Sequence, residues 1–130
     1  MGWEGIAVDA AHSTKHKETE YQGVDLATGE VLFYKNLGNQ TINIGEFLAL
    51  VQGFKFVFEN DCKPKLIWSD SQVAISWFNA KSTSSNKRNK HLQKAEIFLD
   101  LMADEIEDIT IKHWNKRVMG EENPADFGNK

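Results

Sequence analysis

Residues 44–60 read IGEFLALVQGFKFVFEN, and the spacing of their large apolar side chains decides the fold class. These side chains recur three or four positions apart, which is the period of an amphipathic α-helix and not of a strand. They are Ile44, Phe47, Leu48, Val51, Phe54 and Phe58. The sequence therefore predicts one long helix with an apolar face, ending near Asn60.

The residues before this helix favour strands. Residues 3–10 are small or β-branched and predict a first strand that ends in Asp9. Two further runs, 21–26 and 31–34, flank a short segment in which Gly29 supplies a turn, so they predict a hairpin. Three strands in a row indicate an antiparallel meander.

Beyond the long helix, helices and strands alternate. Residues 65–68 and 109–114 predict two short strands, while helical spacing predicts helices from just after Asp70, over 92–106, and from Asn123-Pro124 onward. The strand at 65–68 should run parallel to the first strand, because a crossover helix is what parallel pairing requires. We therefore expect an α/β fold with a five-stranded mixed sheet flanked by helices.

The bulk properties limit the class of protein. At 130 residues the chain has the length of one domain, covering 1–130. It has no apolar run long enough to span a bilayer and no signal-like start, so we expect a cytoplasmic monomer without membrane association. Its only cysteine, Cys62, excludes an intrachain disulfide and a cysteine-based zinc cluster.

The net charge of −4 argues against a strongly cationic nucleic-acid binder. Residues 81–94, however, contain lysine, arginine and histidine but no acidic residue, whereas residues 96–108 are rich in acids. The sequence therefore predicts a local basic loop on an otherwise acidic body.

Four acidic residues stand at predicted strand ends and helix starts. Asp9 closes the first strand, although aspartate is a poor strand former. Glu46, Asp70 and Asp126 lie near predicted helix starts, where a carboxylate can instead cap the helix or oppose its dipole. Each of these three therefore has a structural alternative when it is taken alone.

The predicted topology favours a shared chemical role for these acids. If the strand at 65–68 pairs with the first strand, Asp9 and Asp70 reach neighbouring strand ends, and the helix of Glu46 packs across the same edge. Clustered carboxylates repel one another unless a cation neutralises them. A set of ligands that are all oxygen atoms favours a hard ion such as Mg²⁺. Several acidic side chains around two neighbouring metal ions are typical of two-metal phosphoryl transfer.

Four motifs together resemble those of type 1 ribonucleases H. They are Asp9, the segment 41–46 (TINIGE), the segment 69–72 (SDSQ) and the segment 123–126 (NPAD). The resemblance extends over nearly the whole chain. It is strongest toward a short bacterial branch of the family, which shares the residues GEFLAL at 45–50 and a similar C-terminal segment.

The resemblance implies an endonuclease that hydrolyses the RNA strand of RNA·DNA hybrids and leaves 5′-phosphate and 3′-hydroxyl ends. It implies two Mg²⁺ ions, with Mn²⁺ as a possible substitute, held between Asp9, Glu46, Asp70 and Asp126. In that family the first acid bridges both ions, and we expect the same of Asp9.

The resemblance also indicates residues for substrate binding. Asn43 and Gln72 match family residues that contact base edges or 2′-hydroxyl groups in the minor groove, and Thr41 matches one that binds a phosphate of the DNA strand. Helix capping is the alternative for Thr41 and Asn43, and a solvated position is the alternative for Gln72. The basic loop adds Lys87, Arg88 and Lys90, whose alternative is a solvated loop.

The sequence departs from the commonest family pattern in two loops. Residues 10–18 replace a glycine-rich segment, and residues 115–123 contain no counterpart of the family's loop histidine. We expect Glu121 to take over the catalytic role of that histidine, with a solvated loop acid as the alternative. His12 and His113 are interpreted as strand or surface residues.

Three rival functions remain. The first is a hybrid- or RNA-binding module of the same fold without catalysis, against which four intact acids argue. The second is the nuclease domain of a reverse transcriptase, which a chain with its own Met makes less favoured. The third is a proofreading exonuclease, whose chemistry needs an Asp-x-Glu pair on the first strand where this chain has Asp9-Ala-Ala11.

Overall fold

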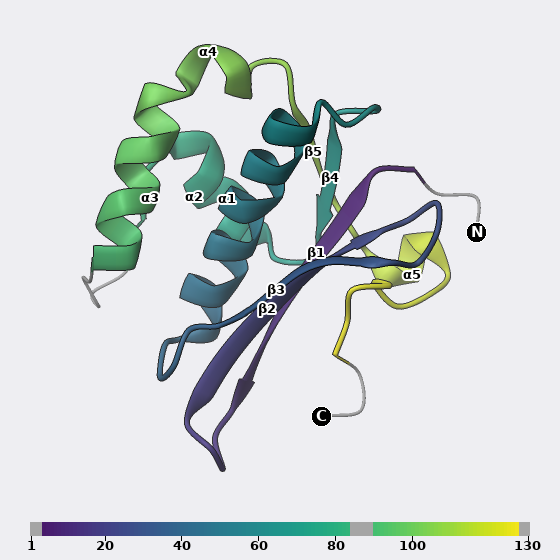
Figure 1. Cartoon of the computed structure of the whole chain (residues 1–130). Helices are drawn as coiled ribbons and strands as arrows, with labels where there is room; N and C mark the ends of the chain where they lie inside the picture. Colours follow the sequence, from purple (N-terminus) through teal and green to yellow (C-terminus); the bar gives the residue numbers. More distant parts are fainter. Residues whose placement is uncertain (1–3, 84–89, 128–130) are drawn as a thin grey trace.

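The computed structural model describes residues 4–83 and 90–127, which form one sheet with helices on both faces (Figure 1). In chain order the elements are β1 (Ile6–Ser13), β2 (Glu18–Asp25), β3 (Val31–Asn36), α1 (Ile42–Asn60), β4 (Leu66–Ser69), α2 (Gln72–Ala80), α3 (Lys90–Leu101), α4 (Ala103–Ile106), β5 (Thr110–His113) and α5 (Lys116–Met119). Figure 1 shows α1 to α4 on one face of the sheet and the short α5 on the other.

The sheet has the strand order β3-β2-β1-β4-β5. The pairs β1/β2 and β2/β3 are antiparallel, whereas β1/β4 and β4/β5 are parallel. This confirms the expected mixed sheet and the parallel pairing of β4 with β1. The long predicted helix is α1, which makes the crossover between the meander and β4.

Two apolar clusters hold the helices against the sheet. The larger cluster lies between the sheet and α1 to α3, where the fully buried Phe54 packs its ring against Phe78 and Phe98. The smaller cluster lies on the opposite face, where the rings of Trp68 and Trp114 meet edge to face with their centroids 5.4 Å apart. Both faces of the sheet therefore bury aromatic area.

The C-terminal part differs from the sequence-based prediction. The predicted helix after Asn123 is absent, and this segment forms a turn in which the Asn123 side chain accepts a hydrogen bond from the Ala125 N–H. A short helix, α5, lies instead in the stretch predicted as a loop, with Asn115 as its N-cap. This bond between the Asn123 side-chain oxygen and the nearby Ala125 N–H stabilises a turn, which competes with helix formation here.

The first strand continues beyond Asp9 to Ser13, so the prediction that Asp9 ends the strand is wrong. It continues because β2 pairs with β1 along the whole length of β1. The predicted helix over 92–106 is likewise divided, since α3 ends at Leu101 and the short α4 follows.

Hydroxyl side chains cap two of the helices. Thr41, one of the two residues for which the sequence offers helix capping as the alternative, caps α1, because its side chain accepts a hydrogen bond from the Ile44 N–H at 3.3 Å. Ser71 caps α2 in the same way at 3.1 Å from the Ala74 N–H. The carboxylates of Glu46 and Asp70 are therefore not engaged as helix caps.

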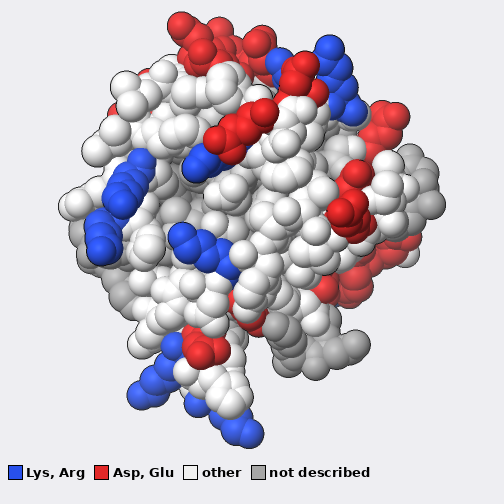
Figure 2. All heavy atoms as spheres, viewed as in Figure 1, with Lys and Arg blue, Asp and Glu red and all other residues white. Residues whose placement is uncertain are grey.

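Charged side chains of both signs are spread over the face of the molecule that Figure 2 shows. Acidic side chains gather over α4 and basic ones around the tip of the β1–β2 hairpin, while further basic side chains lie between these two ends. Lys90 begins α3 and is exposed, whereas Lys87 and Arg88 of the predicted basic loop lie outside the described residues. None of the described helices has the length and apolar character needed to cross a bilayer.

Helix α1 approaches the sheet most closely at Gly45. A Cβ atom at this position would lie 2.7 Å from the Thr19 Cγ2 atom and 3.1 Å from the Ala10 Cβ atom. At Gly53, further along α1, an added Cβ atom would lie 3.3 Å from its nearest neighbour, the Cγ1 atom of Val8. The missing side chain at position 45 thus lets α1 carry the adjacent Glu46 up to the sheet.

We predict that Gly45→Ala lowers the free energy of unfolding by about 1–3 kcal/mol, because the added methyl group overpacks a buried contact. Gly53→Ala is the matched control in the same helix. Its cost should be smaller because the nearest atom to the added methyl group lies 3.3 Å away, while the gain in helix propensity is common to both variants. Denaturant unfolding of both variants measures the difference. Equal stability of the two variants would contradict this role of Gly45.

Candidate active site

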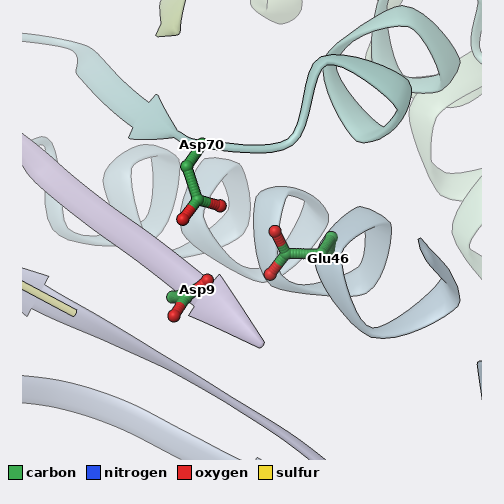
Figure 3. Close-up of side chains that lie close together, drawn as sticks. All are labelled: Asp9, Glu46 and Asp70. Atoms are coloured by element: carbon green, nitrogen blue, oxygen red, sulfur yellow. The ribbon is translucent and has the colours of Figure 1, made fainter. Parts of the chain in front are cut away.

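Three acidic side chains converge at the edge where β1 leaves β4. Asp9 extends from β1, Glu46 from α1 and Asp70 from the end of β4, and Figure 3 shows their carboxylates directed toward one another. One carboxylate oxygen from each residue lies within 4.8 Å of those of the other two. The structure thus brings together three of the four predicted acids.

The parallel register of β1 and β4 explains why two of these acids meet. The last paired residues are Val8 on β1 and Ser69 on β4. Asp9 and Asp70 are the next residues of the two strands, so they leave the pairing side by side. The side chain of Glu46 then reaches the same place from α1, which packs across β1.

Two of the three acids are withdrawn from water. Asp9 and Glu46 are each only 6% exposed, whereas Asp70 is exposed. Burial, followed by the charge of Asp70, raises the pKa of Asp9 above its ordinary value, and the charge of Asp126 adds to this. Burial, followed by the charge of Asp9, likewise raises the pKa of Glu46.

This cluster has the features expected of a cation site. The Oε1 atom of Glu46 is buried and has no hydrogen-bond partner among the described residues. No lysine or arginine of the described ranges forms an ion pair with these three carboxylates. A buried oxygen without a partner is costly, and an all-oxygen donor set suits a hard divalent ion such as Mg²⁺. The residues present therefore fit the metal that the sequence predicts.

The fourth predicted acid, Asp126, is exposed and is not part of this group of three. It stands on the turn that begins at Asn123, whose buried side-chain amide donates to the Val8 carbonyl at 3.0 Å. The Gln22 amide donates to the Ala125 carbonyl at 2.6 Å. These two bonds fasten the turn to β1 and β2, next to Asp9, and they explain why the charge of Asp126 acts on Asp9.

The predicted substrate-binding residues that the structure describes are all exposed. Asn43 and Gln72 are exposed in the first turns of α1 and α2, close in sequence to Glu46 and Asp70 respectively. Thr41 is exposed and caps α1, so its structural alternative is confirmed. Lys90 is exposed at the start of α3.

Glu121 and His113 lie differently from the sequence-based expectation. The Glu121 side chain is exposed, and its backbone carbonyl accepts the Trp114 indole N–H at 3.0 Å. His113, which the sequence indicates only as a strand residue, places its Nε2 atom 3.2 Å from the backbone oxygen of Asp70. The pairing register of β4 and β5 is the feature that could have predicted this contact. His113 on β5 pairs with Ser69 on β4, and Asp70 is the next residue.

The fold matches those of solved ribonucleases H. LC11-RNase H1, isolated from compost by a metagenomic approach, aligns with a TM-score of 0.59 and 15% identity over 88% of this chain and 86% of that chain. The N-terminal RNase H domain of a Mycobacterium tuberculosis protein aligns with a TM-score of 0.54 and 13% identity over 88% and 89% of the two chains.

A viral structure aligns as well. The protease-reverse transcriptase of prototype foamy virus gives a TM-score of 0.56 and 21% identity over 87% of this chain but 17% of that chain. No family model matches the sequence. At these identities the likeness defines the fold, and the chain has the ribonuclease H-like fold that its motifs predict.

We predict that Glu46→Gln raises the melting temperature of the metal-free protein at neutral pH by a few degrees. Burial and the charge of Asp9 raise the pKa of Glu46 in the folded protein, so the folded state binds a proton more tightly than the unfolded chain, which releases it above the ordinary glutamate pKa of about 4.3. The free energy of unfolding therefore falls as pH rises above that value, and the variant avoids this loss. Its advantage should shrink as the pH falls toward 4.

Thermal unfolding in EDTA and in Mg²⁺ checks this prediction. Mg²⁺ should raise the melting temperature of the wild type much more than that of Glu46→Gln, because only the wild type offers the full set of ligands. Glu59→Gln, an exposed position in the same helix, serves as the control and should behave like wild type. A destabilised metal-free Glu46→Gln would show that the carboxylates do not repel one another.

Proposed function

We propose that this chain is an endoribonuclease that hydrolyses the RNA strand of RNA·DNA hybrids, with residues 1–130 acting as a single catalytic domain. The observation that carries the proposal is the convergence of Asp9, Glu46 and Asp70 around a buried, unpartnered carboxylate oxygen, on a ribonuclease H-like fold. The LC11-RNase H1 structure that also matches this fold contains an RNA/DNA hybrid, which supports the choice of substrate.

In the proposed reaction, Asp9, Glu46, Asp70 and Asp126 hold two Mg²⁺ ions, for which Mn²⁺ can substitute. When bound, such ions supply a hydroxide-like nucleophile and charge neutralisation at the leaving oxygen. Asp9, which is buried beside Glu46 and Asp70, would contribute its carboxylate to holding these ions. Asp70 is exposed and so faces the phosphate, while Asp126 closes the site from the C-terminal turn. The products carry 5′-phosphate and 3′-hydroxyl ends.

Discrimination of RNA from DNA is assigned to the first turns of α1 and α2. Asn43 and Gln72 are exposed there, beside the cluster, where they can bond 2′-hydroxyl groups and base edges in the minor groove. Thr41 can offer its hydroxyl to a phosphate of the DNA strand while it caps α1. Lys87, Arg88 and Lys90 are proposed to attract the hybrid through its phosphates. The active unit is proposed to be a cytoplasmic monomer.

A second candidate is the nuclease domain of a longer polymerase, which the likeness to the foamy virus protease-reverse transcriptase favours. In this second candidate the same acids would have the same roles, so both candidates hydrolyse the RNA strand by the same reaction. A module that only binds hybrids is less favoured, because it would retain a repelling carboxylate cluster without using it.

We predict that Asp70→Asn lowers turnover of a labelled hybrid by more than about a hundredfold, because loss of a metal ligand raises the barrier by several kcal/mol. Hybrid binding in EDTA and the melting temperature of the metal-free protein should not decrease. Asp104→Asn, an exposed position on α4, is the control. Turnover of Asp70→Asn within about tenfold of wild type would sink the assignment.

We further propose that Glu121 assists proton transfer or metal release in place of a loop histidine. Glu121→Ala should then lower kcat by about a hundredfold, the lower range for such assistance, with KM and stability nearly unchanged. Glu122→Ala is the neighbouring control and should do little, since its exposed ion pair with Lys116 contributes little to stability. Equal, small effects of both substitutions in steady-state kinetics would remove Glu121 from the mechanism.

A further inference from the structure

A hollow of about 440 Å³ opens beside Asp70, and no residue of α1 lines it. Its walls come from the end of β4, the end of β5, the start of α5 and the segment before Asp126. The residues that line it are Asp70, His113, Trp114, Asn115, Lys116, Arg117, Glu122 and Asn123. This volume is within the range of small-ligand pockets and accommodates a phosphodiester with its sugar.

The charges around this hollow leave one cation available to a ligand. Lys116 is already paired with Glu122, since the Lys116 Nζ atom lies 3.3 Å from a Glu122 carboxylate oxygen. Arg117 lines the same hollow, is exposed, and has no ion pair within residues 4–83 and 90–127. Its guanidinium presents a fork of N–H donors that matches the geometry of a phosphate.

His113 fixes the wall that the hollow shares with the candidate active site. A backbone carbonyl only accepts hydrogen bonds, so the His113 Nε2 atom, 3.2 Å from the Asp70 oxygen, carries the proton of that bond. The bond joins the end of β5 to Asp70. A ligand in the hollow therefore lies against the same residue that faces the scissile phosphate.

We propose that this hollow binds a phosphodiester of the RNA strand next to the scissile one, with Arg117 as its principal ligand. The proposal rests on the function proposed above and adds to it a subsite and a strand. Because Asp70 belongs to both the hollow and the carboxylate cluster, the two phosphates that they bind are neighbours along one strand. The DNA strand lies across the minor groove, on the side of Thr41, and the amides of Asn43 and Gln72 face the groove between the two strands.

Arg117→Ala should weaken binding of an RNA·DNA hybrid in EDTA about tenfold, the value of one charge-assisted hydrogen bond to phosphate. It should raise KM by a similar factor, leave kcat within about twofold, and flatten the log–log salt dependence of binding by somewhat under 1. The affinity and KM of Arg117→Lys should fall between those of the wild type and those of Arg117→Ala. Lys63→Ala, an exposed cation before the start of β4 and so at the far end of that strand from Asp70, should match wild type.

Hybrids with a single uncharged methylphosphonate linkage identify the phosphate. Each modified RNA linkage is compared with an ordinary phosphate that carries the same 2′-O-methyl sugar. The wild type should lose affinity when the linkage beside the cleavage position is neutral. The same neutral linkage should not weaken binding by Arg117→Ala any further, because this variant has already lost the contact with that phosphate. Neutral linkages elsewhere should weaken both proteins equally.

The outcomes separate this inference from the proposed function. If the wild type cleaves hybrid but Arg117→Ala equals Lys63→Ala, the subsite is refuted and the nuclease assignment stands. If the sensitivity of Arg117 maps to a linkage of the DNA strand, the strand assignment is wrong. A wild type that neither binds nor cleaves hybrid overturns both proposals.

Discussion

The close placement of three acidic side chains, two of them buried, is the constraint on which the rest of this structure depends. Asp9 and Glu46 are buried, and one oxygen of each lies within 4.8 Å of an Asp70 oxygen. Such a group does not by itself stabilise the folded state, because burial and neighbouring like charges both make the ionised form of each side chain less favourable than it is in water. The remainder of the fold must supply the free energy that holds these side chains together, and a divalent cation would relieve the repulsion.

Backbone features, more than side-chain contacts among the acids, create this cluster. The parallel register that ends at Val8 and Ser69 places Asp9 beside Asp70. Gly45 lets α1 approach the sheet, and the buried bond from Asn123 to the Val8 carbonyl brings the C-terminal turn to the same edge. Preorganisation of this kind places the acids where a cation can bind them.

Asp70 links two surfaces with different chemistry. Toward α1 and α2 it adjoins exposed amides, which suit sugar hydroxyls and base edges. On its other side it adjoins the hollow lined by His113 and Arg117, which suits an anionic backbone. The proposed substrate, a duplex of two unlike strands, requires such a division between a surface that distinguishes sugars and a surface that holds phosphate.

The sequence by itself determined the order of the five strands and of helices α1 to α3, the parallel pairing of β4, and three of the acids that converge. Apolar periodicity is a local property, and it sufficed for α1 and the hairpin of β2 and β3. The choice between Thr41 and Asn43 as the cap of α1, the role of Ser71 as a cap, the turn at Asn123 and the contact of His113 with Asp70 were decided only by the structure. Each depends on groups distant in sequence or on competition between nearby hydrogen-bond partners, and a residue pattern does not encode which partner a polar side chain finds.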